Sequence, residues 1–245
     1  MDRQWILDAA GTGRHGRADL VAAPGICCLI AAWNEAPRIG AVLEAVAGHP
    51  LVDEVLVIDD GSTDGTAQVA AGFAGVRVLR LGQNGGKSAA VLAGMQATGH
   101  PLLLLLDADL QGLTPEAITA LALPVLDGQA DVAISLRGNA PWLWRWIGLD
   151  YISGERLVPR GVLERIAAHG LPRFGIEVAM NRLWLDHGAR IAVVGWPGVA
   201  SPAKAAKQGL WRGIRADLRM IADLCATLPA HRLAGQIHRM RRQRI

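Results

Sequence analysis

Two rhythms of apolar and polar residues alternate along the chain. One is the short unbroken apolar run, such as the five leucines at 102–106, which is typical of a strand buried on both faces of a sheet. The other spaces apolar side chains three or four positions apart, as in residues 37–48, and predicts helices. The predicted strands are residues 26–32, 54–60, 76–81, 101–107, 131–136 and 190–196. The predicted helices are residues 37–48, 63–74, 87–98, 114–126, 159–170 and 175–188.

The order of these elements predicts the fold class. Strands and helices alternate, and no hairpin signal joins two neighbouring strands. This order favours an α/β fold, Rossmann-like, with a mostly parallel central sheet and helices on both faces. Ligands of such sheets bind at the carboxyl ends of the strands. A functional site is therefore expected among the residues that follow the strands.

Both ends of the chain depart from this alternation. We interpret residues 1–25 as an N-terminal arm, because they contain several glycines and arginines and show no regular period. Residues 26–207 form the expected main domain, and residues 208–245 are expected to form a basic amphipathic helix and tail. The apolar stripe of that helix consists of Leu210, Ile214, Leu218, Ile221, Leu224 and Leu228.

Composition narrows the class of protein. Of the 245 residues, 51% are hydrophobic, so the chain is expected to fold around a sizeable core. Its three cysteines give no disulfide framework and are expected to be reduced core residues. No apolar run reaches the roughly 20 residues that span a bilayer, and the first residues do not resemble a signal peptide. We therefore expect a cytoplasmic protein.

Charge and tryptophan are unevenly distributed. The net charge is +3, and residues 232–245 are rich in arginine and contain no acidic residue, which favours an anionic partner surface. There are eight tryptophans against two phenylalanines and one tyrosine, and Trp142, Trp144 and Trp146 stand close together in a predicted loop. Tryptophan favours membrane interfaces, but such a cluster also suits a lid over a ligand pocket. With the basic helix, the tryptophans favour peripheral association with the cytoplasmic face of the inner membrane.

Two glycine-rich stretches match common nucleotide-binding motifs only in part. Residues 11–16, GTGRHG, fit the dinucleotide-binding pattern, but Pro24 and Gly25 interrupt the helix that should follow. Residues 82–88, GQNGGKS, are one residue short of a phosphate-binding Walker A loop. Neither a dinucleotide-binding oxidoreductase nor a P-loop nucleotidase is favoured.

Acidic residues follow two of the predicted strands. Asp59 and Asp60 stand before a glycine turn, where they can accept hydrogen bonds from a ribose or a base, or form a solvated turn. Asp107, Asp109 and Gln111 follow the leucine run and, in an extended stretch, would project to the same side. Two carboxylates and an amide oxygen, without Cys or His, form a hard oxygen site that suits Mg²⁺ or Mn²⁺ bridged by phosphate oxygens.

Four motifs resemble, in order and spacing, those of family 2 glycosyltransferases, which have the GT-A fold. They are AAWNE (31–35), VIDDGSTDGT (57–66), NGGKSAAVLAG (84–94) and LLDADLQ (105–111). The resemblance covers residues 26–136, and DADLQ is similar to the motif of dolichol-phosphate and polyprenyl-phosphate sugar synthases. It implies that residues 26–112 are a nucleotide-binding half and residues 113–207 an acceptor half.

The resemblance implies a nucleoside diphosphate sugar as donor and Mg²⁺ or Mn²⁺ as cofactor. The implied metal ligands are Asp107, Asp109 and Gln111. The resemblance also implies a catalytic role for Asp109. The implied donor-binding residues are Glu35, Asp59, Asp60, Asn84, Lys87 and Asp107. The metal would neutralise the charge that builds on the nucleoside diphosphate as the sugar leaves.

The acceptor half resembles the same subgroup with departures. Residues 152–160, ISGERLVPR, resemble a stretch in which an aromatic residue is usual at the position of Glu155, and residues 174–183 resemble a helix that carries an acid, here Glu177. The implied acceptor-binding residues are Arg137, Ser153, Arg156, Lys204 and Lys207. A lipid phosphate is already ionised and would attack unaided, whereas a hydroxyl acceptor needs a general base. The candidates for that catalytic base are Glu177 and Asp150, with Glu155 as a further one.

Three functions are compatible with these residues. The first is metal-dependent transfer of a sugar, with inversion, to a polyprenyl phosphate or other membrane lipid. The second is the same chemistry on a soluble acceptor, such as a phosphorylated small acid or a sugar hydroxyl. The third is a catalytically silent nucleotide-sugar-binding protein, against which the intact DADLQ motif argues. An anionic membrane surface is a further expected partner, and nucleic acid is not, because no recognition motif accompanies the basic tail.

Overall fold

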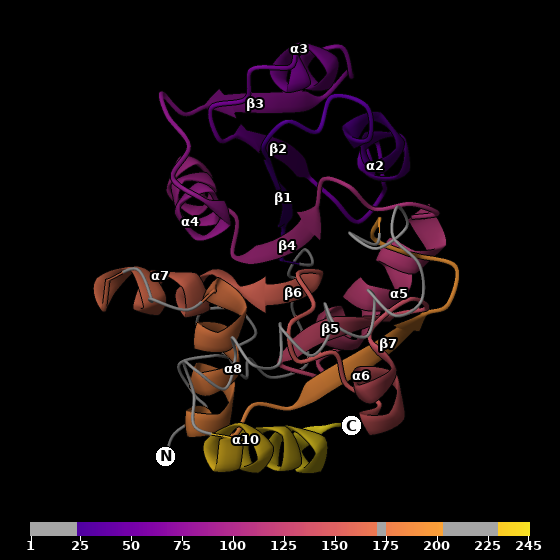
Figure 1. Ribbon diagram of the computed structural model, residues 1–245, viewed down its shortest axis with the longest axis vertical. Helices are drawn as coiled ribbons and strands as arrows, with labels where there is room; N and C mark the ends of the chain where they lie inside the picture. Colours follow the sequence, from indigo (N-terminus) through magenta and orange to yellow (C-terminus); the bar gives the residue numbers. More distant parts are fainter. Residues whose placement is uncertain (1–23, 171–174, 203–229) are drawn as a thin grey trace, which may run out of the picture.

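The computed structural model describes residues 24–170, 175–202 and 230–245. Within these ranges seven strands form one sheet, in the order β3-β2-β1-β4-β6-β5-β7 (Figure 1). The strands are β1 (Ile26–Ala32), β2 (Glu54–Asp59), β3 (Val76–Arg80), β4 (Leu102–Asp107), β5 (Val132–Arg137), β6 (Arg156–Pro159) and β7 (Ile191–Trp196). Six of them confirm the strands predicted from the sequence, and β6 is an addition.

The sheet is parallel except at β6. This strand lies between β4 and β5 and runs antiparallel to both. Consequently β4 and β5 point the same way, and their carboxyl ends lie at the same edge as those of β1 and β2. The sequence did not predict β6 because its four residues, RLVP, include a proline and are too few to show either period.

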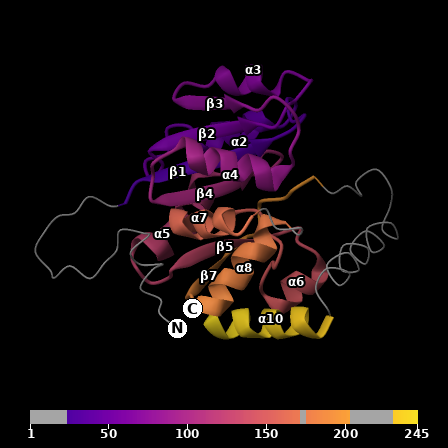
Figure 2. The same cartoon turned by 90° about the vertical axis from the view of Figure 1, so that its left-hand side faces the viewer.

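Helices cover both faces of the sheet, as predicted. They are α2 (Ile39–Val46), α3 (Thr66–Ala71), α4 (Lys87–Ala97), α5 (Pro115–Leu126), α6 (Trp142–Ile147), α7 (Arg160–Ala168), α8 (Ile176–His187) and α10 (Ala230–Gln243). Side chains of α2, α3 and α5 belong to the apolar cluster on one face, and those of α4, α7 and α8 to the cluster on the other (Figures 1 and 2).

The leucine run explains why β4 is central. Leu102, Leu104 and Leu106 pack into one apolar cluster, and Leu103 and Leu105 pack into the other. Each of the five is at most 3% exposed, and burying one such side chain contributes about 2 kcal/mol. This burial fixes the end of β4, and therefore Asp107, at one edge of the sheet.

The tryptophan cluster forms a short helix, α6, where the sequence predicted a loop. Its members have different environments. Trp144 is buried and stacks on Tyr151 at 6.1 Å between ring centroids, whereas Trp146 is 78% exposed. The single helical turn was not predicted because three tryptophans at alternate positions do not share one helical face.

The basic helix expected near the end of the chain is confirmed for its described part, α10. Leu233 and Met240 of α10 are buried in the same apolar cluster as α8, and Gln236 accepts a hydrogen bond from the Tyr151 hydroxyl. The apolar side of α10 therefore packs on the protein (Figure 2). The predicted apolar stripe at 210–228 lies outside the described residues, as does nearly all of the predicted arm at 1–25. In the described ranges, no helix combines the length and the apolar character needed to cross a bilayer.

Candidate active site

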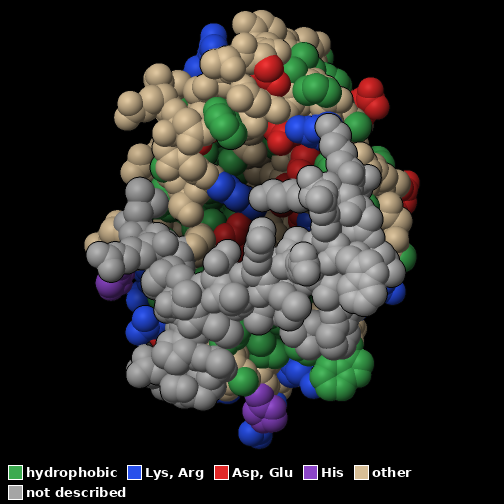
Figure 3. All heavy atoms as spheres, viewed as in Figure 1, with side chains coloured by type: hydrophobic (Ala, Val, Ile, Leu, Met, Phe, Trp, Pro, Cys, Tyr) green, Lys and Arg blue, Asp and Glu red, His purple; other side chains and the backbone are tan. Residues whose placement is uncertain are grey.

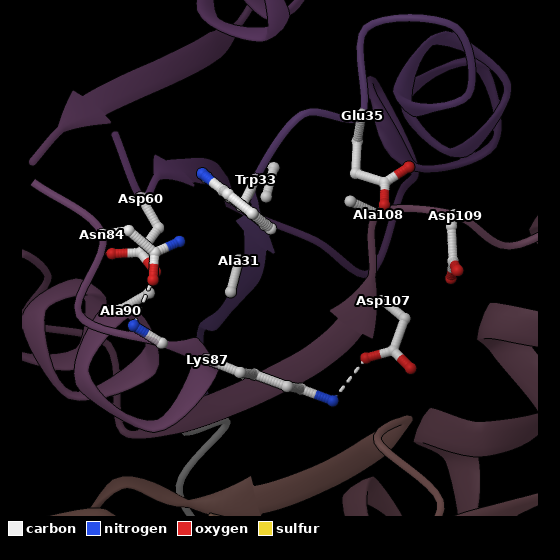
Figure 4. Close-up of a pocket in the computed structure, with 12 residues that line it drawn as sticks. Ala31, Trp33, Glu35, Asp60, Asn84, Lys87, Ala90, Asp107, Ala108 and Asp109 are labelled. Carbon is white, nitrogen blue, oxygen red and sulfur yellow. Dashed lines mark hydrogen bonds and ion pairs between the residues drawn. The ribbon is translucent and has the colours of Figure 1, made fainter. Parts of the chain in front are cut away.

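A pocket of about 360 Å³ opens at the carboxyl ends of β1 and β4 (Figures 3 and 4). Pockets of this size are typical of sites for small molecules and cofactors. Its polar walls come from Glu35, Asp60, Asn84, Lys87, Asp107 and Asp109. Its floor consists of small residues, including Ala31, Ala32, Gly86, Ala90 and Ala108, so a ligand can approach the backbone closely. All six polar residues were predicted from the sequence.

Two loops beside the pocket hold each other in place. Asn34 has φ of 56°, a conformation that is uncommon outside glycine. Its side-chain oxygen accepts a hydrogen bond from the Thr63 backbone N–H, and its own N–H donates to Ser62 Oγ at 2.9 Å. The Glu35 N–H donates to Thr66 Oγ1 at 2.9 Å. These contacts hold Glu35 at the rim, where its carboxylate pairs with Arg38 at 2.5 Å.

Asp60 and Asp59 have different environments, although they are neighbours in sequence. The Asp60 carboxylate accepts hydrogen bonds from the N–H groups of Gly85 and Gly86, at 2.9 and 2.8 Å. It thereby fixes the loop that carries Asn84 and leads into α4. Asp59 is fully buried, accepts a hydrogen bond from the Ser62 N–H and pairs with Arg80 at 3.2 Å. Only Asp60 of the two lines the pocket.

Lys87 connects the two halves of the site. Its Nζ lies 2.5 Å from Asp107 Oδ1 (Figure 4). The same Nζ lies 2.9 Å from Glu177 Oε1. Loss of solvent opposes the charged form of Lys87, but the two carboxylates outweigh it and raise its pKa above the ordinary value. Burial likewise opposes ionisation of Glu177, and the Lys87 charge holds its pKa below the ordinary value. Both groups are therefore charged at neutral pH.

Gly154 lies directly beside the contact between Lys87 and Asp107. A Cβ at Gly154 would lie 2.5 Å from Asp107 Oδ1 and would also collide with Lys87 Nζ. The loop before β6 thus closes one side of the lysine and carboxylate pair. The sequence pattern gave no role to Gly154.

Asp107 and Asp109 line the same pocket, but not through an extended stretch as the sequence suggested. β4 ends at Asp107, and residues 108–109 form a turn. Burial and the negative charges of Asp107 and Glu35 raise the pKa of Asp109. Clustered acids of this kind favour a bound cation, so the donor set fits a hard divalent metal.

Gln111, the third predicted metal ligand, is not among the pocket-lining residues. Its backbone N–H donates to Ala200 O at 2.8 Å, and its side chain is exposed. In the described ranges, no three acidic, His or Cys side chains gather closely enough to hold a metal by themselves. A metal here would take two carboxylates and complete its shell with donor phosphate oxygens and water, as Mg²⁺ usually does.

A buried polar network lies beside Asp107, in the half of the sheet that contains β5 and β6. Arg137 pairs with Asp150 at 3.4 Å and with Glu155 at 3.5 Å. Glu155 accepts hydrogen bonds from Ser135 Oγ and Ser153 Oγ at 2.8 and 2.6 Å. Burial raises the pKa of Asp150, and burial together with the Asp107 charge raises that of Glu155.

Asp150 and Ser153 have surroundings that differ from those expected of residues at an acceptor site. Both side chains are fully buried and are held by partners within the protein. Neither is exposed to a ligand in this structure, so their predicted roles as base and as acceptor contact stay predictions. Of this network, Arg137 alone keeps some exposure, 12% of its side chain.

Arg156, which was predicted to bind the acceptor, has its guanidinium in the core and not at an exposed surface. It is fully buried, donates to Asn181 Oδ1 at 2.6 Å, to Ser153 O at 2.7 Å and to Tyr151 O at 3.1 Å, and lies 4.9 Å from the ring centroid of Trp184. Arg156 holds β6 to α8 and to the loop before it. Lys204 and Lys207, the remaining predicted acceptor residues, lie outside the described part of the chain.

Trp33 is a site residue that sequence reasoning did not select. It lines the pocket and is 54% exposed. Figure 4 shows its ring between Asp60 and Glu35. The available signal was its place in AAWNE, directly after a buried strand, because exposed tryptophan at a strand end often contacts a ligand.

An α/β sheet with an acid-lined, lysine-containing pocket at the carboxyl ends of its strands defines a nucleotide-binding type of enzyme fold. Residues 27–175 match the model of glycosyl transferase family 2, and the chain belongs to this family. The resemblance to family 2 glycosyltransferases found in the sequence is confirmed, as is the GT-A fold.

Relatives of known function include polyprenyl-phosphate sugar transferases. The chain is 29% identical over 134 residues to dodecaprenyl-phosphate galacturonate synthase of Rhizobium johnstonii, across 51% of this chain and 39% of that protein. It is 28% identical over 186 residues to polyprenol monophosphomannose synthase of Mycolicibacterium smegmatis, across 64% of this chain and 69% of that protein. Several relatives are much longer, and the matched stretch spans 26% to 39% of their length.

Solved structures show the same fold. Glucosyl-3-phosphoglycerate synthase of Mycobacterium tuberculosis, crystallised with Mn²⁺, uridine diphosphate and glucosyl-3-phosphoglycerate, has a TM-score of 0.65 at 24% identity. The likeness covers 92% of this chain and 84% of that one.

Proposed function

We propose that this protein transfers a sugar from a nucleoside diphosphate sugar to a polyprenyl phosphate or another membrane lipid, with inversion at the anomeric carbon. The observation that carries the proposal is the meeting of Lys87, Asp107 and Asp109 at one wall of a pocket at the carboxyl edge of the sheet. The polyprenyl-phosphate relatives support the acceptor class.

The donor would occupy the pocket between Trp33 and Lys87. Trp33 offers an aromatic face to a base, and Glu35, Asp60 and Asn84 offer hydrogen-bonding groups to a base or ribose. Asp60 already accepts the N–H groups at the start of α4, so a diphosphate would rely on the Lys87 ammonium for its positive partner. Asp59 would support the donor site from beneath, through Ser62 and Arg80.

The Asp107 and Asp109 carboxylates, which line the same pocket, would hold a divalent metal, with Gln111 as a further ligand only if its side chain turns toward them. Mn²⁺ and Mg²⁺ are both suitable, and the Mn²⁺-containing structural neighbour supports the class. When bound, such an ion supplies Lewis-acid stabilisation of the leaving diphosphate.

The acceptor would approach between Arg137 and Glu177. A lipid phosphate is ionised near neutral pH and needs no base, so Arg137, and Lys204 and Lys207 from the undescribed segment, would serve to position it. We place the reaction at the cytoplasmic face of a membrane, with the protein bound peripherally.

A soluble acceptor is the second candidate, and one observation favours it. The structural neighbour was crystallised with glucosyl-3-phosphoglycerate. For a hydroxyl acceptor, Glu177 is the candidate base, because its carboxylate is ionised and lies beside Lys87 and Asp107.

A direct transfer assay tests the proposal. The purified chain is incubated with a panel of nucleoside diphosphate sugars, with Mn²⁺ or Mg²⁺, and with either a polyprenyl phosphate or a phosphorylated small acid, and products are detected by mass spectrometry. We expect a glycosylated polyprenyl phosphate that disappears on chelation and in Asp109→Ala. Asp127→Ala, which removes an exposed acid at the end of α5, is the matched control.

The outcomes separate the candidate functions. Product only from the phosphorylated small acid would replace the lipid acceptor with the soluble one. Donor binding by calorimetry without product from either acceptor would favour the catalytically silent binder. Full activity of Asp109→Ala would contradict the site assignment.

A further inference from the structure

The most exposed large apolar side chain in the described residues is Trp146 of α6, at 78%. Ile245, just after α10, follows at 56%. Trp33, at 54%, lines the pocket and has a ligand-binding explanation there. Neither Trp146 nor Ile245 belongs to the pocket, so their exposure needs a separate explanation.

Trp146 and Ile245 lie on elements that touch each other. Arg244 Nη1 donates a hydrogen bond to Gly148 O at 3.0 Å, and Gly148 is the C-cap of α6. A guanidinium at a helix C-terminus satisfies a free carbonyl and complements the helix dipole. This contact joins the end of α10 to the end of α6. We call the resulting surface the α6–α10 corner, consisting of Arg145, Trp146, Arg241, Arg244 and Ile245.

The corner continues into a basic helix face. The inward positions of α10 are Leu233, Gln236 and Met240, which are buried. The outward positions include the exposed residues His238, Arg239, Arg241 and Arg242. Neither α6 nor α10 contains an acidic residue.

Within the described residues, the acids beside α6 and under α10 do not neutralise this charge. Asp150, close after α6, is fully buried and pairs with Arg137. Asp186, on the helix under α10, lies 3.7 Å from Arg182 of the same helix. The outer surface of the corner therefore presents tryptophan and arginine together.

We propose that the α6–α10 corner docks the protein on the surface of an anionic membrane. Trp146 would enter the headgroup region, where the indole ring is favoured, and the arginines would meet anionic headgroups. Because the apolar side of α10 packs on the protein, Trp146 would supply the apolar contact and α10 only the electrostatic attraction to anionic lipid. The inference deepens the proposed function by naming the surface that would hold the protein at a membrane containing the lipid acceptor, and it rests on that function only for this purpose.

Vesicle flotation tests the surface directly. The full chain is mixed with vesicles of phosphatidylcholine alone or with phosphatidylglycerol added, and the bound fraction is measured at low and high salt. We expect binding only to the anionic vesicles, weakened by salt. Arg241→Gln with Arg242→Gln should weaken binding by about fivefold for each arginine, and Trp146→Ser should weaken it severalfold at any salt concentration.

Matched controls use equivalent side chains elsewhere. Arg165→Gln removes an exposed arginine on α7, and Leu123→Ser removes an apolar side chain that is 42% exposed on α5. Both should bind vesicles as the parent does, and thermal melting should confirm that every variant is folded. Failure of the parent to float, or equal losses in the control and corner variants, would overturn the proposal.

Two further measurements distinguish neighbouring explanations. If duplex DNA displaces the protein from vesicles and Trp146→Ser has no effect, the corner is a general polyanion surface and the membrane proposal is wrong. Transfer to a short-chain, water-soluble polyprenyl phosphate should be unchanged in the corner variants, whereas transfer to a vesicle-embedded acceptor should fall. Vesicle binding without transfer to either acceptor would refute the proposed function and leave the docking surface standing.

Discussion

Lys87 joins two carboxylates that come from distant parts of the chain. Its Nζ lies 2.5 Å from Asp107 and 2.9 Å from Glu177. Without its charge, two carboxylates would face each other across a partly desolvated space. Lys87 therefore both orients the site and offers the positive charge that a diphosphate requires.

We predict that Lys87→Met lowers transfer by about 10²-fold, the usual effect of losing one group that stabilises developing charge. Initial rates at saturating donor and acceptor measure this. Lys87→Arg keeps the charge and should retain part of the activity. Unchanged turnover of Lys87→Met would show that the ammonium is only structural.

Gly154 should affect activity more than stability. A Cβ there meets Asp107 and Lys87 Nζ, and the lysine end can move aside without unfolding the sheet. We expect Gly154→Ala to reduce transfer at least tenfold with little change in Tm. Gly99→Ala, where a Cβ meets nothing within 4 Å, is the control and should leave both unchanged.

Substitution of Arg156 should affect stability more than activity. Its guanidinium donates to three backbone carbonyls and to the Asn181 side-chain oxygen in the core. Arg156→Leu should lower the free energy of unfolding by about 3 kcal/mol or more, because these groups lose a charged partner. Urea unfolding of this variant and of Arg182→Leu, an exposed position expected to change stability by at most about 0.5 kcal/mol, provides the comparison.

At this scale the sequence predicted residue identities better than residue environments. Asp60, Lys87, Asp107 and Asp109 meet as expected, because each follows or leads an element that ends at the same sheet edge. The link from Lys87 to Glu177 joins two distant parts of the chain, and spacing along the sequence cannot reveal it. Arg156 was predicted to bind the acceptor from the resemblance of residues 152–160, and its burial follows only from the central position of β6.

At the scale of elements, the closeness of α4 to the sheet sets the position of Lys87. The helix approaches β1 and β2 because it has glycine at position 94. A Cβ at Gly94 would lie 2.7 Å from Ile58 Cδ1 and 3.3 Å from Leu29 Cδ2. The first turn of α4, and Lys87 with it, depends on that packing.

Alanine substitutions at two helical glycines should therefore have opposite effects on stability. Gly94→Ala should destabilise the protein by about 1–3 kcal/mol through overpacking. Gly40→Ala in α2, where a Cβ would lie 3.9 Å from Phe73, should stabilise it by up to about 1 kcal/mol through helix propensity. Thermal or urea unfolding of the two variants measures both, and stabilisation by Gly94→Ala would contradict the close packing of α4.

The elements that the sequence missed share a physical cause. β6 has four residues and α6 has six, so neither is long enough for a period to be recognised. β6 is a strand because β4 and β5 offer it pairing partners on both sides. Its pairing depends on strands that are distant in sequence, so the local sequence gives little indication of it.

At the scale of the whole molecule, the sheet and its two helical layers form a scaffold to which the donor and a metal would add stability. Ligands that bind only the folded state stabilise it by mass action, by about 2.7 kcal/mol at 100 times the Kd. We expect the accepted nucleoside diphosphate sugar with Mn²⁺ to raise Tm, and chelation to reverse most of the increase.

The control for this prediction is Asp109→Ala, which should lose the metal-dependent part of the increase and keep any metal-independent part. An equal increase with and without Mn²⁺ in the parent would argue against a metal between Asp107 and Asp109. At this scale the sequence predicted the fold class and the polar residues that line the pocket, because the four motifs follow strands of the sheet. The polar groups beside the pocket were less predictable, because they come from β5, the loop before β6 and α8.

The placement of β6 has a consequence for synthesis of the protein. β4 pairs with β1 on one side, but its other edge is covered only by residues 156–159, which the ribosome delivers after α5, β5 and α6. During that interval the nascent chain holds its most apolar strand with one edge open, and an open apolar edge is a template for intermolecular pairing. Translation speed through this region and access to chaperones should therefore govern the soluble yield, and fragments that end before β6 should aggregate.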